Sequence, residues 1–75
     1  MKKIIIIPTY NEKENIKKLI NEINSLGIKN LDILVIDDNS PDGTANTVDE
    51  IKKAASNIFL LKRNKNLLIT EYKPH

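Results

Sequence analysis

The sequence contains no cysteine and no tryptophan, and only two of its 75 residues are glycine. The absence of cysteine excludes a disulfide scaffold and any metal site with cysteine ligands. The two glycines, Gly27 and Gly43, cannot form a Gly-x-Gly-x-x-Gly loop, which excludes the usual dinucleotide-binding unit. Aromatic residues make up 4% of the chain, too few for a stacking platform that binds single-stranded nucleic acid.

Neither sign of charge dominates, because 12 basic residues are interleaved with 10 acidic ones. This balance argues against a nucleic-acid partner. Long apolar segments are also missing from the sequence. The run Ile4–Ile7 is shorter than the about 7–15 residues of a signal peptide's apolar region, and no stretch approaches the ~20 residues of a membrane span. We therefore expect a cytoplasmic location, with any membrane contact peripheral.

The chain is instead rich in isoleucine and leucine, with 13 and 8 residues, and their spacing changes along the sequence. Lys3–Ile7 is β-branched and apolar after its first residue, which predicts a strand buried on both faces and ended by Pro8. A helical period then runs from Glu12 to Gly27, which predicts an amphipathic helix with Asn11 as its N-cap. The residues expected on its inner face are Ile16, Leu19, Ile20 and Ile23.

The second half of the chain continues this alternation. Leu31–Asp37 predicts a second strand, Thr44–Ser56 a second helix and Ile58–Leu61 a third strand. The inner face of the second helix is expected to hold Val48, Ile51, Ala54 and Ala55. This order predicts an α/β fold, a Rossmann-like three-layer βαβαβ unit whose parallel strands lie in the order 3-2-1. We expect one partial domain over residues 1–75, with the unit in 1–61 and an irregular or divergent tail in 62–75.

Two polar loops follow the first two predicted strands, at residues 8–12 and 37–43. Ligands of open parallel sheets bind beyond the carboxyl ends of the strands, so both loops should lie at one edge. Their acidic residues, which would share that edge, are Glu12, Asp37, Asp38 and Asp42. A nucleoside, backbone N–H groups at helix starts or a metal ion could each satisfy them. From the residues alone, Asp42 is either a helix cap or a ligand, and Asp38 either a solvated turn residue or a ligand.

Two stretches carry a resemblance to a known family. They are Ile5-Ile6-Ile7-Pro8-Thr9-Tyr10-Asn11-Glu12, followed by Asn15-Ile16, and Val35-Ile36-Asp37-Asp38-Asn39-Ser40-Pro41-Asp42-Gly43-Thr44. Together they resemble the family 2 glycosyltransferases of the GT-A fold. The Ser-Pro-Asp-Gly-Thr continuation is most similar to the polyprenol-phosphate (dolichol-phosphate) mannosyltransferase branch. The resemblance implies an inverting transfer of a sugar from a nucleoside-diphosphate sugar, with GDP-mannose favoured, to a polyprenyl phosphate acceptor.

The resemblance also implies which residues contact the nucleotide sugar: Pro8, Tyr10, Glu12, Ile36 and Asp38. In such a site the Tyr10 ring lies against the base and Glu12 accepts from nucleoside hydroxyls. A carboxylate such as Asp38 suits guanine, which offers two donors side by side, N1–H and N2–H₂. Supporting roles fall to Asn11, Asp37, Ser40 and Asp42, with Asp37 fixing the second loop from beneath. No catalytic residue is assigned, because the acceptor phosphate is already anionic.

The sequence departs from the family pattern after the third strand. Leu67-Leu68-Ile69-Thr70 stands where relatives have a glycine-rich turn, and no Asp-x-Asp metal motif occurs. Full-length relatives are expected to use Mg²⁺ or Mn²⁺ to neutralise the leaving diphosphate, and none is expected to be held by this chain alone. The chain therefore resembles a truncated amino-terminal, nucleotide-binding half, which we expect to bind a nucleoside diphosphate weakly and to be inactive alone.

Two other functional classes remain as alternatives. A non-catalytic nucleotide-binding or interaction fragment differs from the enzyme only in lacking turnover. A receiver-like signalling module would also have an acidic pair at a strand end, but here the pair Asp37-Asp38 follows the second strand rather than the first. The first strand should have an uncovered flank, which predicts self-association through that sheet edge.

Overall fold

The computed structural model describes residues 1–63 as alternating strands and helices. The elements are β1 (Lys3–Thr9), α1 (Lys13–Ser25), β2 (Leu31–Asp37), α2 (Thr44–Lys52) and β3 (Ile58–Lys62). The strands form one parallel sheet in the order β1-β2-β3. This confirms the predicted α/β class and strand order. The predicted tail from residue 64 onward, including Leu67–Thr70, lies outside the described residues.

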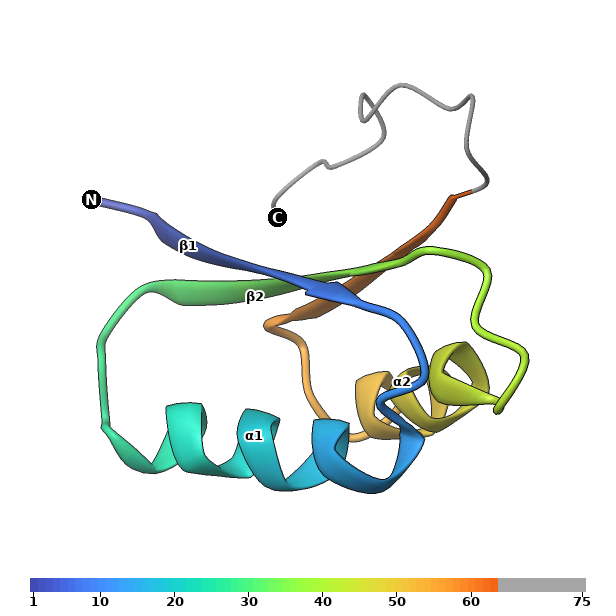
Figure 1. Cartoon of the computed structure of the whole chain (residues 1–75). Coiled ribbons are helices and arrows are strands. Elements are labelled where there is room, and N and C mark those ends of the chain that lie inside the picture. Colours follow the sequence, from blue (N-terminus) through green and yellow to red (C-terminus); the bar gives the residue numbers. More distant parts are fainter. Residues whose placement is uncertain (64–75) are drawn as a thin grey trace.

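Both helices lie on the same face of the sheet (Figure 1). The two connections step across the sheet in the same direction, from β1 to β2 to β3. Since crossovers between parallel strands are right-handed, two steps in one direction place both helices on one side. Residues 1–63 thus provide the sheet and one helix layer.

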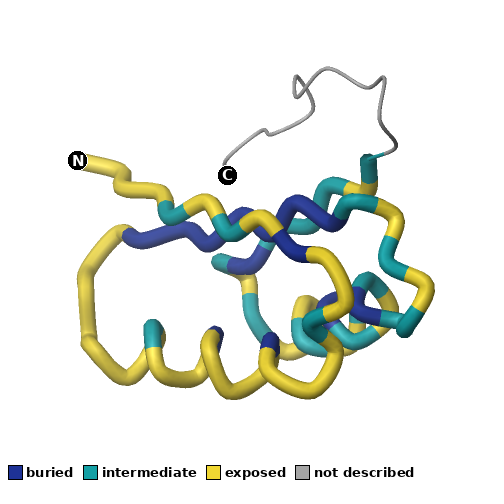
Figure 2. The backbone as a smooth tube through the Cα atoms, in the orientation of Figure 1, coloured by how far each residue is buried: buried dark blue, intermediate teal, exposed yellow. Residues whose placement is uncertain are grey.

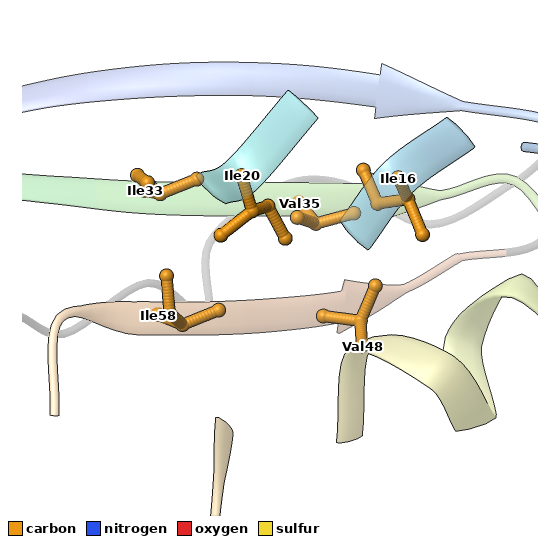
Figure 3. Close-up of a cluster of buried hydrophobic side chains, with 6 residues drawn as sticks. All are labelled: Ile16, Ile20, Ile33, Val35, Val48 and Ile58. Atoms are coloured by element: carbon orange, nitrogen blue, oxygen red, sulfur yellow. The ribbon is translucent and has the colours of Figure 1, made fainter. Parts of the chain in front are cut away.

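The core lies between this helix layer and the sheet. It contains six buried side chains, which Figure 3 shows meeting between the elements: Ile16, Ile20, Ile33, Val35, Val48 and Ile58. β2 lies in the middle of the sheet and is buried along its whole length, as Figure 2 shows. Its predicted bounds were correct, because a continuous apolar run is typical of a central parallel strand.

The predictions for β1 need two corrections. The strand does not end at Pro8 but continues to Thr9, with Pro8 opposite Ile36 in the register. β1 has one strand neighbour among the described residues, so proline is tolerated there as on an edge strand. The strand is also not buried on both faces, because Ile6 is 55% exposed and Ile4 is exposed with it. These two side chains alternate with Ile5 and Ile7 and point away from the helix layer.

Both helices also differ in detail from the prediction. Leu19 does not join the inner face of α1 but is 40% exposed, because α1 packs through Ile16 and Ile20. α2 ends at Lys52 instead of Ser56, and its last turn tightens through a bond from Ala55 N–H to the Lys52 carbonyl. No helix within residues 1–63 is both long enough and apolar enough to cross a bilayer.

Candidate functional site

The loops after β1 and β2 lie side by side at the carboxyl edge of the sheet. Thr9 and Asp37, the last residues of the two strands, are opposite each other in the register. Immediately beyond them, the Asp38 N–H donates to the Thr9 carbonyl at 3.0 Å. The parallel pairing therefore brings the two predicted motif loops together, as the sequence indicated.

Asp37 holds the second loop from beneath. Its side chain is buried, and hydrogen-bond donors from the end of β1 and from the loop after β2 surround it. Oδ1 accepts from the Thr9 hydroxyl at 2.9 Å and from the Ser40 hydroxyl at 2.6 Å, while Oδ2 accepts from the Ser40 N–H at 2.9 Å. With these three donors, Asp37 serves the loop's structure and does not face outward as a ligand.

Asp42 joins the starts of the two helices. Its Oδ2 accepts from the Lys13 N–H at 3.0 Å, and its Oδ1 accepts from the Thr44 N–H at 2.9 Å and from the Thr44 hydroxyl. The Thr44 hydroxyl has the largest effect and lowers the pKa of the Asp42 carboxyl below its ordinary value; burial, next in size, opposes it, and the Lys13 and Thr44 N–H groups lower the pKa further. Asp42 therefore bonds to the starts of both helices from outside their N-cap positions, which are Glu12 in α1 and Gly43 in α2.

The prediction that Asn11 caps α1 was wrong. The residue at the N-cap position is Glu12, whose own side chain makes no capping bond. Asn11 instead has a φ of 56°, in the left-handed region that asparagine tolerates better than most residues. Its N–H donates to Ser40 Oγ at 2.9 Å. Asn39 in the second loop has the same kind of backbone, with a φ of 57°.

The residues expected to contact the nucleotide differ in how open they are. Tyr10 is 58% exposed, and Pro8 is exposed beside it. Glu12 is half-buried and accepts from the Asn15 side-chain amide at 3.4 Å. Ile36, by contrast, is buried, so a ligand would meet its backbone more readily than its side chain.

Asp38 is half-buried and lies close to a cation from the third strand's end. Arg63 follows β3 directly, its N–H donates to the Asp37 carbonyl at 2.8 Å, and its Nε lies 3.6 Å from Asp38 Oδ1. Arg63 therefore brings a guanidinium group to the edge where the two loops meet.

Two threonines at this edge received no role from the sequence. Thr9 and Thr44 are both buried, and their hydroxyls bond to Asp37 and Asp42 respectively. In the sequence, only their positions could have indicated such a role: Thr9 directly follows Pro8, and Thr44 directly follows Gly43. Neither position is distinctive without knowledge of which loops meet.

The four carboxylates at this edge do not converge on one point. Asp37 and Asp42 bond to hydroxyl and N–H groups, Asp38 faces Arg63, and Glu12 bonds to Asn15. Within residues 1–63 there is no group of three or more acidic or histidine side chains arranged to hold a metal ion. The described residues thus provide no set of ligands for the magnesium or manganese ion that the resemblance implies.

A parallel βαβαβ sheet with joined polar loops at its carboxyl edge defines a Rossmann-like α/β protein. The family model for glycosyl transferase family 2 matches residues 4–70. The chain therefore belongs to glycosyltransferase family 2.

Three of the curated proteins that are similar to the chain have named activities. The dolichol-phosphate mannosyltransferase of Pyrococcus furiosus is 48% identical over 52 residues, which is 68% of this chain and 15% of that protein. The polyprenol monophosphomannose synthase of Mycolicibacterium smegmatis is 43% identical over 51 residues, 68% of this chain and 19% of that protein. The GalNAc(5)-diNAcBac-PP-undecaprenol beta-1,3-glucosyltransferase of Campylobacter jejuni is 36% identical over 61 residues, 80% of this chain and 20% of that protein.

The chain thus spans a fifth or less of the length of these three relatives. No solved structure matches it significantly.

Proposed function

We propose that this chain forms the nucleotide-binding part of a family 2 glycosyltransferase that transfers mannose from GDP-mannose to a polyprenyl phosphate. The observation that carries the proposal is that bonds between the two chain segments join, at one edge of the sheet, the loop with Tyr10 and Glu12 to the loop with Asp38. The names of two relatives, a dolichol-phosphate mannosyltransferase and a polyprenol monophosphomannose synthase, support this choice of sugar and acceptor. A glucosyltransferase among the relatives makes glucose the competing sugar.

The nucleoside contacts follow from the exposed groups at this edge. The open ring of Tyr10 offers a flat apolar surface to a base. The Asp38 carboxylate accepts from the adjacent N1–H and N2–H₂ groups of guanine, and a charged acceptor strengthens both bonds. Arg63, 3.6 Å from Asp38, keeps a positive charge near this carboxylate and near the diphosphate that would follow the nucleoside.

The chemistry needs little from a general base, because the acceptor phosphate is already an anion. The difficult part is the departure of the diphosphate, which magnesium or manganese would assist by neutralising its charge. Residues 1–63 contain no set of ligands for such an ion. A polyprenyl phosphate acceptor would be reached at a membrane surface, so the proposal includes a cytoplasmic chain with peripheral membrane contact.

A comparison of the binding of three ligands tests the proposal. Ligand-observed NMR on the 75-residue chain would compare GDP, UDP and GDP-mannose, with Glu22→Ala at the far end of α1 as a matched control for Asp38→Ala. A few net hydrogen bonds of about 1 kcal/mol each predict roughly millimolar binding of GDP. Asp38→Ala should weaken it by at least about tenfold, since a bond to a charged group is worth about 1.5–3 kcal/mol, and Glu22→Ala should not. A chain without saturable binding, or an Asp38→Ala variant that binds like wild type, would contradict the proposal.

The same sample separates the alternatives. Mannosyl transfer to a polyprenyl phosphate by the 75-residue chain would rule out the non-catalytic nucleotide-binding fragment, whereas binding of GDP without transfer is expected of both. Tighter binding of UDP than of GDP would indicate that the sugar donor is a uridine nucleotide instead of GDP-mannose. A receiver-like module has little support, because the acidic pair follows β2 and β3 ends at Lys62 rather than at an aspartate.

We also propose that the chain associates with itself through β1. Among residues 1–63, β1 pairs only with β2, and Ile4 and Ile6 are exposed on this strand. An open strand edge with apolar neighbours favours pairing with another chain. Sedimentation should show concentration-dependent association that Ile6→Lys reduces and Leu26→Lys, on an exposed residue outside the sheet, does not. A monomer at all concentrations with a cooperative melt would contradict this proposal.

A further inference from the structure

Three consecutive backbone N–H groups, at and just before the start of α1, are bonded to side chains of the second loop and of the first residue of α2. The N–H of Asn11 donates to Ser40 Oγ at 2.9 Å, and that of Glu12 donates to Thr44 Oγ1 at 3.0 Å. The N–H of Lys13 donates to Asp42 Oδ2 at 3.0 Å. Two of the acceptors, Ser40 and Asp42, lie in the segment that links β2 to α2, and the third, Thr44, is the first residue of α2.

These bonds replace an ordinary helix cap. The first N–H groups of a helix have no partner within the helix, and usually the side chain at the N-cap position accepts from one of them. In α1 that residue is Glu12, which makes no such bond. The start of α1 is therefore capped by residues 29 and 32 positions further along the chain. The geometry of the first loop depends on the second loop being in place.

Thr44 is the central residue of this arrangement. Its side chain is fully buried, and its hydroxyl donates to Asp42 Oδ1 while accepting from the Glu12 N–H. A valine here would have nearly the same shape but could do neither. Thr44 thus links the Asp42 carboxylate to the backbone of Glu12, which stands two residues after Tyr10.

We propose that Thr44 and Asp42 are positioning residues that lock the two loops into a single nucleotide site. This inference rests on the proposed function for its ligand, but the lock itself rests only on the contacts between the loops. Asp42 and Thr44 contact no substrate in this arrangement. They fix the distance between the first loop, with Tyr10 and Glu12, and the second loop, with Asp38.

The lock also determines where the diphosphate does not bind. Helix starts often hold phosphate groups through their open N–H groups. At α1 the N–H groups of Glu12 and Lys13 are already bonded, and the Asp42 carboxylate stands beside them. A negative charge at this place repels a phosphate. The diphosphate must therefore be contacted by other groups than the start of α1.

The test combines amide hydrogen exchange with a GDP titration on the full 75-residue chain. Thr44→Val removes the hydroxyl and keeps the shape, whereas Thr44→Ser keeps the hydroxyl. Thr47→Val is the matched control, because the Thr47 hydroxyl bonds to the Gly43 carbonyl at 3.3 Å within the same helix and not to the first loop. Thermal melts of all variants establish that each is folded at the temperature of the experiment.

Thr44→Val should speed exchange of the Glu12 amide and weaken GDP binding, each by about fivefold, as expected for the loss of one hydrogen bond. Thr44→Ser should restore both values, and Thr47→Val should leave both at the wild-type level. Equal exchange and affinity in Thr44→Val and wild type would overturn the proposal. So would a Thr47→Val variant that loses as much as Thr44→Val, because the effect would then be general destabilisation.

A second variant covers the case in which Thr44→Val does not fold. Asp42→Asn keeps the shape but loses the charge and one acceptor atom, so exchange of the Lys13 amide should increase, while that of Ala54, in the turn after α2, stays unchanged. Unchanged Lys13 exchange would overturn the lock. If the wild-type chain binds no GDP, the proposed function fails, and the exchange rates of Glu12 and Lys13 still decide whether the lock exists.

Discussion

The hydroxyl of Thr9 donates to Oδ1 of Asp37 at 2.9 Å, joining the last residue of β1 to the last residue of β2. Both side chains are buried, with Asp37 only 2% exposed. A buried carboxylate is costly unless donors surround it, and Thr9 supplies one of the three that Asp37 receives. The sheet edge that positions the candidate site is thus held by a polar contact between neighbouring strands.

Replacing Thr9 tests this contact. Thr9→Val keeps the β-branched shape but removes a donor from a buried carboxylate, so the free energy of unfolding should fall by roughly 1–3 kcal/mol. Thr9→Ser keeps the hydroxyl and should lose clearly less. Urea unfolding followed by circular dichroism measures both values. Equal losses in the two variants would show that the methyl group, and not the hydroxyl, matters at this position.

The left-handed backbone at Asn11 gives a second prediction. Alanine is strained at a φ of 56°, so Asn11→Ala should lower the free energy of unfolding by about 1 kcal/mol. Asn11→Gly should be close to neutral, because glycine adopts this conformation without a steric cost. If Asn11 were a helix cap acting through its side chain, Asn11→Ser would be close to neutral, because serine also caps helices, whereas at a φ of 56° it should be strained like alanine. Thermal or urea unfolding of the serine variant beside the other two distinguishes these outcomes.

Asp42 should make stability depend on acid pH. Its pKa is lowered in the folded chain, chiefly by the Thr44 hydroxyl, so on acidification the unfolded chain takes up this proton first. The contribution of Asp42 is complete above the ordinary aspartate pKa of about 3.9 and is lost as the pH falls through the lowered folded value. Urea midpoints at neutral pH and at about pH 3 should therefore differ less in Asp42→Asn than in wild type. An identical acid loss in both would contradict the bonds assigned to Asp42.

The core can be tested on two neighbouring residues of α1. Ile20 is fully buried in the cluster between helix and sheet, whereas Leu19 is 40% exposed. Ile20→Ala should cost about 2–5 kcal/mol, a large fraction of the stability of a chain of this size. Leu19→Ala should cost well under half of that. Similar losses in both variants would mean that α1 is rotated about its axis, with Leu19 packed against the sheet as deeply as Ile20.

Local patterns in the sequence predicted the elements well, and particular residues show why. The run Leu31–Asp37 is apolar at nearly every position and is bounded by turn residues, so its limits as β2 were clear. The βαβαβ order then fixed the sheet and placed both loops at one edge. Glu12, Asp37, Asp38 and Asp42 were expected at this edge and are found there.

The errors have a common physical cause, which is that they depend on partners distant in sequence. Asn11 looked like a cap because a local rule considers only nearby residues, whereas the N–H of Glu12 bonds to Thr44, 32 positions away. Leu19 fits the helical period, but the sheet covers only the narrower stripe through Ile16 and Ile20. Pro8 ends many strands, yet it is tolerated in a strand with one open edge.

The most direct test of the central claim, that the two loops form one nucleotide site, is a single titration of ¹⁵N-labelled chain with GDP. The amide signals of Tyr10 and Glu12 in the first loop and of Asp38 and Ser40 in the second should shift along one common binding curve. Signals from the outer face of α1, such as that of Asn21, should stay in place. Shifts in one loop only, two different curves for the two loops, or no saturable shift in either loop would contradict the claim.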